Sequence, residues 1–503
     1  MELLSSVAGG FAQAISLTNL FYCFVGVSLG TLIGVLPGIG PMLGIALLLP
    51  VTFYLPPDAA IIMLAGIYYG GEYGGSITSI LVNLPGSASS AVTCIDGYQM
   101  AKKGRAAVAL YVTAVASFIA GTTGILLMTL FSPVIAEFAL SFTSVDYFSV
   151  MLLGLLASSS VGRGSPLKSV GALVVGVLFG IVGTDVSTGI QRYAMGFPEL
   201  ITGISIVAIA MGLFGLPEVI SGSGDGEERI KVGKVRLRDM LPTREEVRRS
   251  TMPVVRGTSL GSLLGALPGT GVTISAFLAY SIEKRVSRTP EIFGTGAVEG
   301  VAAPESANNA AAQTAFIPTL TLGIPGSATM ALILGALMIH GIPPGPQFMT
   351  DHGDLFWALV ASFWIGNLFL LVLNIPLVGI WIKLLEVPYR YLFPSIICLI
   401  CVGVYSVSLN VFDVWLVLGI GVLGYAMRLT GFDAAPFLMG FILGPLMEEN
   451  LRRALLLNRG DFSVFVTHPI SLTCLIITVL LLLWPLIGRG LRRLRGSRAG
   501  ASV

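Results

Sequence analysis

The sequence predicts an all-α, polytopic membrane protein with two inverted structural repeats that contain broken or re-entrant helices. The 503 residues are 54% hydrophobic and 11% charged, whereas a soluble domain carries about 25% charged residues. Lipid must therefore be the solvent. Residues 26–40 and 257–271 read GVSLGTLIGVLPGIG and GTSLGSLLGALPGTG, identical at ten of fifteen positions with an offset of 231. A repeated Pro-Gly interruption in apolar sequence indicates a transport site.

Apolar segments of about 20 residues recur along the chain, as membrane-spanning helices require. In the first half we expect them at 20–55, 59–84, 106–131, 145–160, 168–184 and 200–220. The second half follows with 257–282, 308–340, 355–385, 391–409, 411–429 and 433–447, and one more lies at 466–488. A β-barrel would alternate polar and apolar residues, which these segments do not.

The segments predict four parts. They are a first transmembrane repeat at 1–220, a charged cytoplasmic linker at 221–256, a second transmembrane repeat at 257–455, and an extra transmembrane helix with a basic cytoplasmic tail at 456–503. The linker carries fifteen charges, nine of them basic, and the tail from Arg489 carries five arginines and no acid. Such basic segments stay in the cytoplasm.

The same charges predict the orientation of the repeats. One unpaired helix leads to the cytoplasmic tail, so the second half, which starts inside, must end outside. The first half ends inside and would start outside, which makes the two repeats inverted. Arg452, Arg453 and Arg459 would then lie outside, partly offset by Glu448 and Glu449.

Each half contains two Pro-Gly interruptions. The first pair is Pro37-Gly38 and Pro268-Gly269, and the second lies in 84–88 and 324–328, matched at an offset of 240. Proline removes an N–H and glycine adopts conformations that other residues avoid. The helix therefore ends, and unpaired N–H and C=O groups remain inside the membrane. Kinks or surface loops are the alternative interpretation.

Substrate, ions or water can satisfy these groups, because helix N-termini favour carboxylates and carbonyl ends favour Na⁺. We therefore predict a carboxylate-binding site built from the interruptions of both halves. Its predicted residues are Pro37, Gly38, Gly40, Asn83, Pro85, Gly86, Ser87, Pro268, Gly269, Gly271, Pro325, Gly326 and Ser327.

Two acidic residues lie in membrane-embedded sequence. Glu72, in GIYYGGEYGG, matches Glu305, in GVAAPESANN, at an offset of 233. Charge is costly there, so a functional role is the default interpretation. We predict that Glu72, Glu305, Asn308 and Asn309 bind a coupling cation, Na⁺ or H⁺, or shape the site. A structural carboxylate that accepts backbone hydrogen bonds near a helix end is the alternative.

The sequence gives no support for an enzymatic, metal-binding or nucleic-acid-binding function. The motifs GxxxxGK[ST] and HExxH do not occur, and three histidines without metal-ligand spacing predict no catalytic residue, no metal and no further cofactor. No basic block with interleaved aromatics predicts a nucleic-acid partner. Cys398 and Cys401 have the spacing of a metal or redox pair, but buried thiols are the simpler interpretation. A channel, in which broken helices form a filter, is the alternative to a transporter.

Several long motifs resemble the large membrane subunit (TctA type) of the tripartite tricarboxylate transporters. They are GVLPGIGP (34–41), YYGGEYGGSITSILVNLPGSASS (68–90), DGYQMAKKG (96–104), GALPGTG (265–271), GVAAPESANNAA (300–311), LTLGIPGSATMALILGALMIHGIPPGP (320–346) and GFILGPLMEENLRRAL (440–455). The resemblance implies ion-gradient-driven uptake of a tricarboxylate or related organic anion across the bacterial inner membrane, and no enzymatic activity. It also implies two partners, a small membrane subunit and a periplasmic solute-binding protein.

Overall fold

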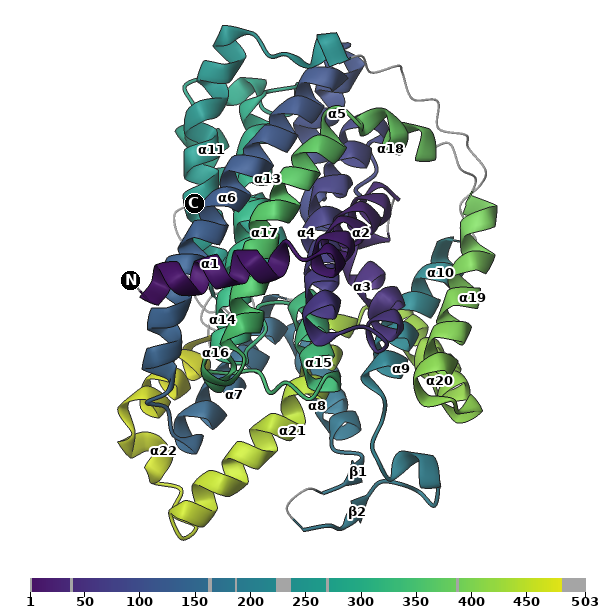
Figure 1. Ribbon diagram of the computed structural model, residues 1–503, viewed down its shortest axis with the longest axis vertical. Coiled ribbons are helices and arrows are strands. Elements are labelled where there is room, and N and C mark those ends of the chain that lie inside the picture. Colours follow the sequence, from purple (N-terminus) through teal and green to yellow (C-terminus); the bar gives the residue numbers. More distant parts are fainter. Residues whose placement is uncertain are drawn as a thin grey trace, which may run out of the picture. The chain divides into compact units, whose positions relative to one another are not determined.

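The computed structural model describes residues 2–36, 39–161, 165–185, 188–222, 237–267, 271–385 and 389–481. Most of these residues are helical, and the strands among them are two short ones, so the prediction of an all-α protein is confirmed. The chain divides into two compact units, which are described separately below (Figure 1).

Unit 1 comprises Met1–Leu140 and Ser205–Leu429. Its first-half elements are α1 (Glu2–Ala14), α2 (Leu17–Val35), α3 (Gly40–Thr52), α4 (Pro57–Val82), η1 (Ser89–Ala91), α5 (Thr93–Lys102), α6 (Ala106–Ala139), α9 (Ile206–Ala210), the π-helical turn η3 (Met211–Gly215) and α10 (Leu216–Gly222). The second half adds η4 (Leu237–Met240), α11 (Arg244–Gly265), α12 (Gly271–Val286), η5 (Pro290–Ile292), α13 (Glu299–Thr314), α14 (Phe316–Thr321), α15 (Ala328–Ile339), α16 (Gln347–Asp351), α17 (Gly353–Asn374), α18 (Val378–Leu384), α19 (Tyr389–Ser408) and α20 (Val411–Leu429).

Unit 2 comprises Ser141–Ile204 and Thr430–Val503. Its elements are α7 (Ser144–Val161), α8 (Pro166–Gly180), the antiparallel pair β1 (Gly183–Thr184) and β2 (Gln191–Arg192), η2 (Pro198–Leu200), α21 (Ala434–Leu457), α22 (Val464–Thr467) and a helix over Pro469–Leu481. Helices α8 and α21 pack with their backbones in contact. A Cβ added at Gly176 would lie 2.0 Å from the Phe437 carbonyl oxygen, so only glycine permits this approach.

Four helices in the described parts of the chain are long and apolar enough to cross a membrane, namely α2, α6, α17 and α20. Shorter apolar helices accompany them in both units. Large apolar side chains such as Phe131 and Trp415 are exposed on these helices, as expected for surfaces that face lipid. The structure therefore supports a multi-pass membrane protein.

The element boundaries refine the expected segments. Range 20–55 consists of two helices, α2 and α3, separated by the first interruption. Helix α11 begins at Arg244 rather than at 257, because Thr243 and Glu246 form a capping box at its N-terminus. The expectation of buried thiols is wrong for Cys398, which is exposed, and Cys401 is only partly buried.

The two halves repeat the same helix pairing. Helix α2 packs along α4, and α11 packs along α13. A Cβ added at Gly30 would lie 2.5 Å from the Ile67 carbonyl oxygen, and one added at Gly261 would lie 2.2 Å from that of Ala307. Small residues at every fourth position let the backbones of membrane helices meet in this way. The repeated sequence is therefore also a repeated structure.

This packing corrects the expected match between Glu72 and Glu305. The contact partners Ile67 and Ala307 are related by an offset of 240, not 233. The same offset relates Asn83 to Gly323, which have φ of 60° and 71°. Glu305 therefore lies about two helical turns nearer the start of its helix than Glu72 does. The two acidic residues are different positions of the repeat, because a short motif match did not preserve the helix register.

The halves also pack on each other within unit 1. Helix α3, which follows the first interruption, contacts α15, which follows the last one. In the reciprocal arrangement, α12 contacts η1. Helix α13 further packs against α4 and α6. The predicted domain boundaries at 220, 256 and 455 stay a prediction.

Candidate functional site

The first pair of interruptions is described only at its ends. Pro37, Gly38, Pro268 and Gly269 lie outside the described residues. Gly40 and Gly271 begin α3 and α12 with φ of 66° and 61°. This left-handed conformation favours glycine, so both predicted positions start a helix in the same way.

The second pair of interruptions consists of the loops Asn83–Ser87 and Gly323–Ser327. Each loop begins with a left-handed residue and continues into Pro-Gly-Ser. The Ser87 hydroxyl oxygen accepts a hydrogen bond from the Ser90 N–H at 3.3 Å, and that of Ser327 accepts one from the Met330 N–H at 3.3 Å. Each loop therefore ends one helix, and the hydroxyl of its serine accepts a hydrogen bond from an N–H at the start of the next helical element; Ser327 is the N-cap of α15.

Within each half, the second interruption lies against the helix that precedes the first. A Cβ added at Gly86 would lie 1.9 Å from the carbonyl oxygen of Gly34, in α2. For Gly326, the nearest atom among the described residues would be the carbonyl oxygen of Gly265, in α11, at 3.7 Å. The structure thus brings the predicted interruptions of each half together, with less room at Gly86 than at Gly326.

Both predicted carboxylates are buried next to these loops. Glu305 accepts hydrogen bonds from the hydroxyl of Ser76, at 2.6 Å, and from that of Thr93. Glu72 accepts them from Ser87, at 3.3 Å, and from Ser89. The exposed fractions of Glu72 and Glu305 are 2% and 1%. The term carboxylate cluster is used below for Glu72, Ser76, Ser87, Ser89, Thr93 and Glu305.

The carboxylate cluster has no compensating positive charge. Across the described part of the chain, no Lys, Arg or His forms an ion pair with Glu72 or Glu305. A buried carboxylate without a partner is strongly disfavoured. The cluster is therefore chemically suited to take up protons or a metal cation.

The two predicted asparagines differ in their bonding. Asn309 donates a hydrogen bond to Ser117 at 2.7 Å and one to the carbonyl oxygen of Glu305 at 3.1 Å. Asn308 lies beside Glu72, yet within the described ranges neither its amide nitrogen nor its amide oxygen has a well-formed hydrogen bond. Asn309 thus ties α13 to α6, whereas Asn308 has hydrogen-bonding capacity free at the cluster.

The structure adds residues that the sequence did not single out. Ser76 lies one helical turn after Glu72, a spacing that places both on one face of a helix. That spacing was a usable signal. Thr93 lies more than 200 positions before Glu305, and nothing local in the sequence indicates that these two residues meet.

A third buried carboxylate, Asp96, has its hydrogen bonds satisfied. One oxygen accepts from the backbone N–H groups of Gly294, Gly296 and Ala297 at 2.9, 2.7 and 2.8 Å. The other accepts from the hydroxyl of Tyr280 at 2.9 Å. Asp96 therefore joins α5 to α12 and to the loop before α13, which is a structural role.

Comparison with known proteins finds a matching family and two similar chains. Residues 20–439 match the family model described as the tripartite tricarboxylate transporter TctA family. An Agrobacterium vitis protein named "Uncharacterized 52.8 kDa protein in TAR-I ttuC' 3'region" is 52% identical over 487 residues, which cover 95% of this chain and 97% of that protein. A second, named "Uncharacterized protein in TAR-II ttuC' 3'region", is 54% identical over 230 residues, 45% of this chain and 95% of that protein. No solved structure matches.

Proposed function

This chain belongs to the tripartite tricarboxylate transporter TctA family, and on that premise we propose that it drives the uptake of a carboxylate across the bacterial inner membrane by using an ion gradient. The cargo is a tricarboxylate or a related organic anion. A periplasmic solute-binding protein delivers it, and a small membrane subunit completes the system. The multi-pass helical fold supports this proposal, as does the buried, uncompensated carboxylate cluster.

The observation that carries the proposal is that Ser87 is shared between two features. It belongs to the second interruption of the first half and also donates a hydrogen bond to Glu72. A carboxylate substrate at the interruption and a cation at Glu72 would therefore lie next to each other. Without the cation, the negative charge of Glu72 repels the anionic substrate, whereas a bound cation attracts it. Such a difference is what couples two ligands thermodynamically.

The substrate end of the site uses backbone N–H groups. Helix α15 begins at Ala328 with Ser327 as its N-cap, and the N-terminus of a helix favours negative charge. Gly326 precedes this N-terminus, and no atom of the described residues lies closer than 3.7 Å to a Cβ added there. The interruptions 83–87 and 323–327 would together hold the carboxylate groups of the substrate.

An inverted arrangement of the halves is part of the proposal. The reciprocal packing of α3 with α15 and of α12 with η1 is what a two-fold relation between repeats produces. Two of the three basic residues near the end of the second half are paired within unit 2. Arg452 contacts Asp185 at 2.8 Å and Glu448 at 2.7 Å, and Arg453 contacts Glu449 at 2.6 Å. These pairs reduce the positive charge that would oppose an external location.

Uptake in proteoliposomes that contain both membrane subunits and the binding protein tests the proposal. Labelled citrate is the first probe, with Na⁺ and pH gradients imposed separately. We expect accumulation above the external concentration only with an inward cation gradient and the binding protein. A channel, the alternative, would equilibrate the probe without accumulating it and would not need the binding protein.

The site is tested in the same assay. Gly326→Leu should abolish uptake because its side chain fills the space in front of α15, while Gly326→Ala, which the space accepts, should retain it. Both variants should be purified in wild-type yield. Normal uptake by Gly326→Leu would rule out the assignment of the substrate to this loop. Gly86 is unsuitable for this test, because even alanine there collides with the Gly34 backbone.

A further inference from the structure

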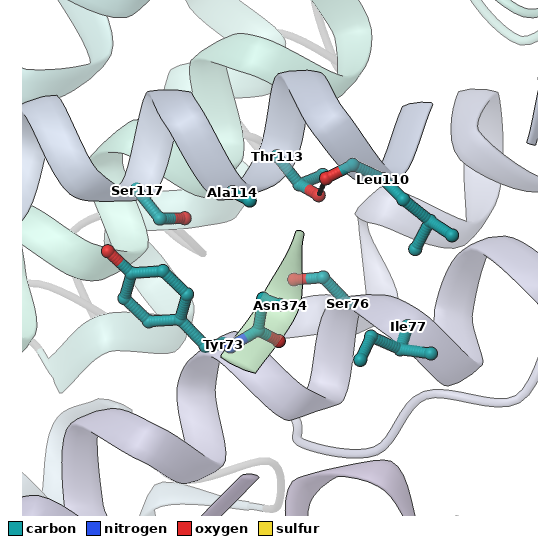
Figure 2. Close-up of a pocket in the computed structure, with 8 residues that line it drawn as sticks. All are labelled: Tyr73, Ser76, Ile77, Leu110, Thr113, Ala114, Ser117 and Asn374. Atoms are coloured by element: carbon teal, nitrogen blue, oxygen red, sulfur yellow. Dashed lines mark hydrogen bonds between the residues drawn. The ribbon is translucent and has the colours of Figure 1, made fainter. Parts of the chain in front are cut away.

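A small pocket lies between α4, α6 and the last residue of α17 (Figure 2). Its volume is about 10 Å³, room for about one water-sized particle. Figure 2 shows Thr113 and Ser117 on one helix facing Tyr73 and Ser76 on another, with Asn374 between them. None of these five polar residues was predicted from the sequence as part of a site.

Three of the four hydroxyl protons around the pocket are already used elsewhere; the fourth hydroxyl, that of Ser117, accepts a hydrogen bond from Asn309 at 2.7 Å. Tyr73 donates to Asn367 Oδ1 at 2.7 Å. Ser76 donates to Glu305 at 2.6 Å, and Thr113 donates to the Leu110 carbonyl oxygen at 2.8 Å. What these three oxygens can offer to the pocket is their lone pairs. The pocket is therefore rich in hydrogen-bond acceptors and poor in donors.

Asn374 adds an acceptor without a partner. Its side-chain nitrogen donates to the Leu370 carbonyl oxygen at 2.9 Å, which fixes the orientation of the amide. Its Oδ1 is buried and has no hydrogen-bond partner among the residues that the structure describes, and the residue is 3% exposed. Leaving such an atom unpaired is costly, so the pocket is suited to a ligand with positive charge.

The surroundings identify the kind of ligand. Ser76 lines the pocket and is bonded to Glu305, so an uncompensated negative charge lies one hydroxyl group away. Neutral hydroxyl and amide oxygens are hard ligands. They suit cations that bind oxygen in preference to nitrogen or sulfur. In the described ranges there is no cluster of three His, Cys, Asp or Glu residues that would favour a divalent or transition metal.

We propose that this pocket binds one Na⁺ ion, separate from the cation at Glu72. The inference rests on the proposed function and makes it specific. An ion in the pocket compensates Glu305 through Ser76, and an ion beside Asn308 compensates Glu72. Each buried carboxylate then has its own cation, so two Na⁺ ions accompany each transport cycle.

Thermal unfolding of the two-subunit membrane complex in detergent tests this site. NaCl replaces choline chloride at constant ionic strength, and Tm is followed as the Na⁺ concentration rises. Thr113→Val and Asn374→Leu each remove one pocket oxygen and nearly preserve shape. We expect the Na⁺ concentration for half-maximal stabilisation to rise at least about tenfold in both variants, and the Hill coefficient to fall from above one to about one.

Matched controls remove comparable groups elsewhere. Thr123 also lies on α6 and donates to a carbonyl oxygen one turn earlier, at 2.9 Å, but is exposed. Asn458 ends α21 in unit 2 and donates to the Ala454 carbonyl oxygen at 2.8 Å, as Asn374 does to Leu370. Thr123→Val and Asn458→Leu should leave the Na⁺ titration unchanged.

Two results would overturn the inference. One is a Na⁺ titration that is the same in the wild type and in both pocket variants, which would mean that the pocket holds only water. The other is the absence of any Na⁺-specific stabilisation of the wild type. The proposed function is judged separately, because citrate accumulation driven by a pH gradient would survive either result. Failure to accumulate under any gradient would remove the proposed function itself.

Discussion

At the scale of single residues, the buried carboxylates of unit 1 that form no ion pair within the described residues fall into two kinds. Asp96 accepts hydrogen bonds from three backbone N–H groups and one phenol, so it stabilises the fold. Glu72 and Glu305 accept hydrogen bonds from hydroxyl groups and have no ion-pair partner in the described structure. Mutation of Asp96 should therefore change the stability of the protein, whereas mutation of Glu72 or Glu305 should change transport.

Asp96→Ala should destabilise the protein strongly. The substitution leaves the N–H groups of Gly294, Gly296 and Ala297 without their acceptor, and each unsatisfied buried group costs about 1–3 kcal/mol. Tyr280→Phe removes a single hydrogen bond and should cost only about 1 kcal/mol. Thermal unfolding in detergent measures both. Equal Tm values for the two variants would contradict the structural role of Asp96.

Glu305→Gln should reduce transport without reducing stability. It removes a buried, uncompensated charge while keeping the shape of the side chain, so the Tm measured without Na⁺ should be unchanged or higher. Cation-driven uptake should fall at least about tenfold, because a neutral amide cannot compensate a cation as a carboxylate does. A variant with wild-type uptake and unchanged Na⁺ dependence would show that Glu305 is only structural.

At the scale of elements, the repeat consists of two helix pairs, α2 with α4 and α11 with α13, and each pair has glycine at the contact. Gly30→Ala and Gly261→Ala should both reduce the yield of folded protein, because their new Cβ atoms would lie 2.5 and 2.2 Å from the facing carbonyl oxygens. Gly419→Ala on α20 is the control, since no atom of the described part of the chain lies within 4 Å of an added Cβ there. Size-exclusion profiles compare the three. Wild-type profiles for both contact variants would mean that the pairs pack less closely.

The capping box of α11 predicts a dependence on pH. Burial opposes the ionisation of Glu246, but the hydrogen bonds from Thr243 and the charge of Arg105 outweigh it and hold the pKa of Glu246 below its usual 4.5. A lowered pKa stabilises the folded state above pH 4.5, and this contribution is lost as pH falls through the folded-state pKa. Glu246→Gln should therefore lower Tm at pH 7, with the difference from the wild type disappearing below that pKa. A constant difference across this range would contradict the assignment.

At the scale of the whole molecule, the inverted arrangement predicts opposite sides for two exposed positions. Glu245, at the start of α11, should face the cytoplasm, and Asp461, after α21, should face the periplasm. Single cysteines at these positions, in a background without the five native ones, are labelled with an impermeant maleimide in intact and inside-out vesicles. Labelling of both from the same side would make the inverted arrangement wrong.

The sequence anticipated the site in part. The Pro-Gly-Ser loops were recognised because their chemistry is local, and the structure shows Asn83 and Gly323 in the same left-handed conformation. The predicted equivalence of Glu72 and Glu305 is wrong, because a match of ten-residue motifs does not determine how two helices align along their length. The partners Ser76 and Thr93 of Glu305 come from other helices. The sequence did not predict the pocket at Asn374, because its walls come from three helices that are distant in the sequence.

The sequence by itself determined that lipid surrounds this protein, that its elements are helices, and where those helices are interrupted. These properties follow from side-chain hydropathy and from the backbone limits of proline and glycine, which act over a few residues. The tertiary structure alone decided which polar groups share an interior. Within the described chain, Glu72 and Glu305 lie there without a compensating charge, and Asn374 Oδ1 lies there without a hydrogen-bond partner. That outcome depends on helix packing between residues hundreds of positions apart, which no local pattern encodes.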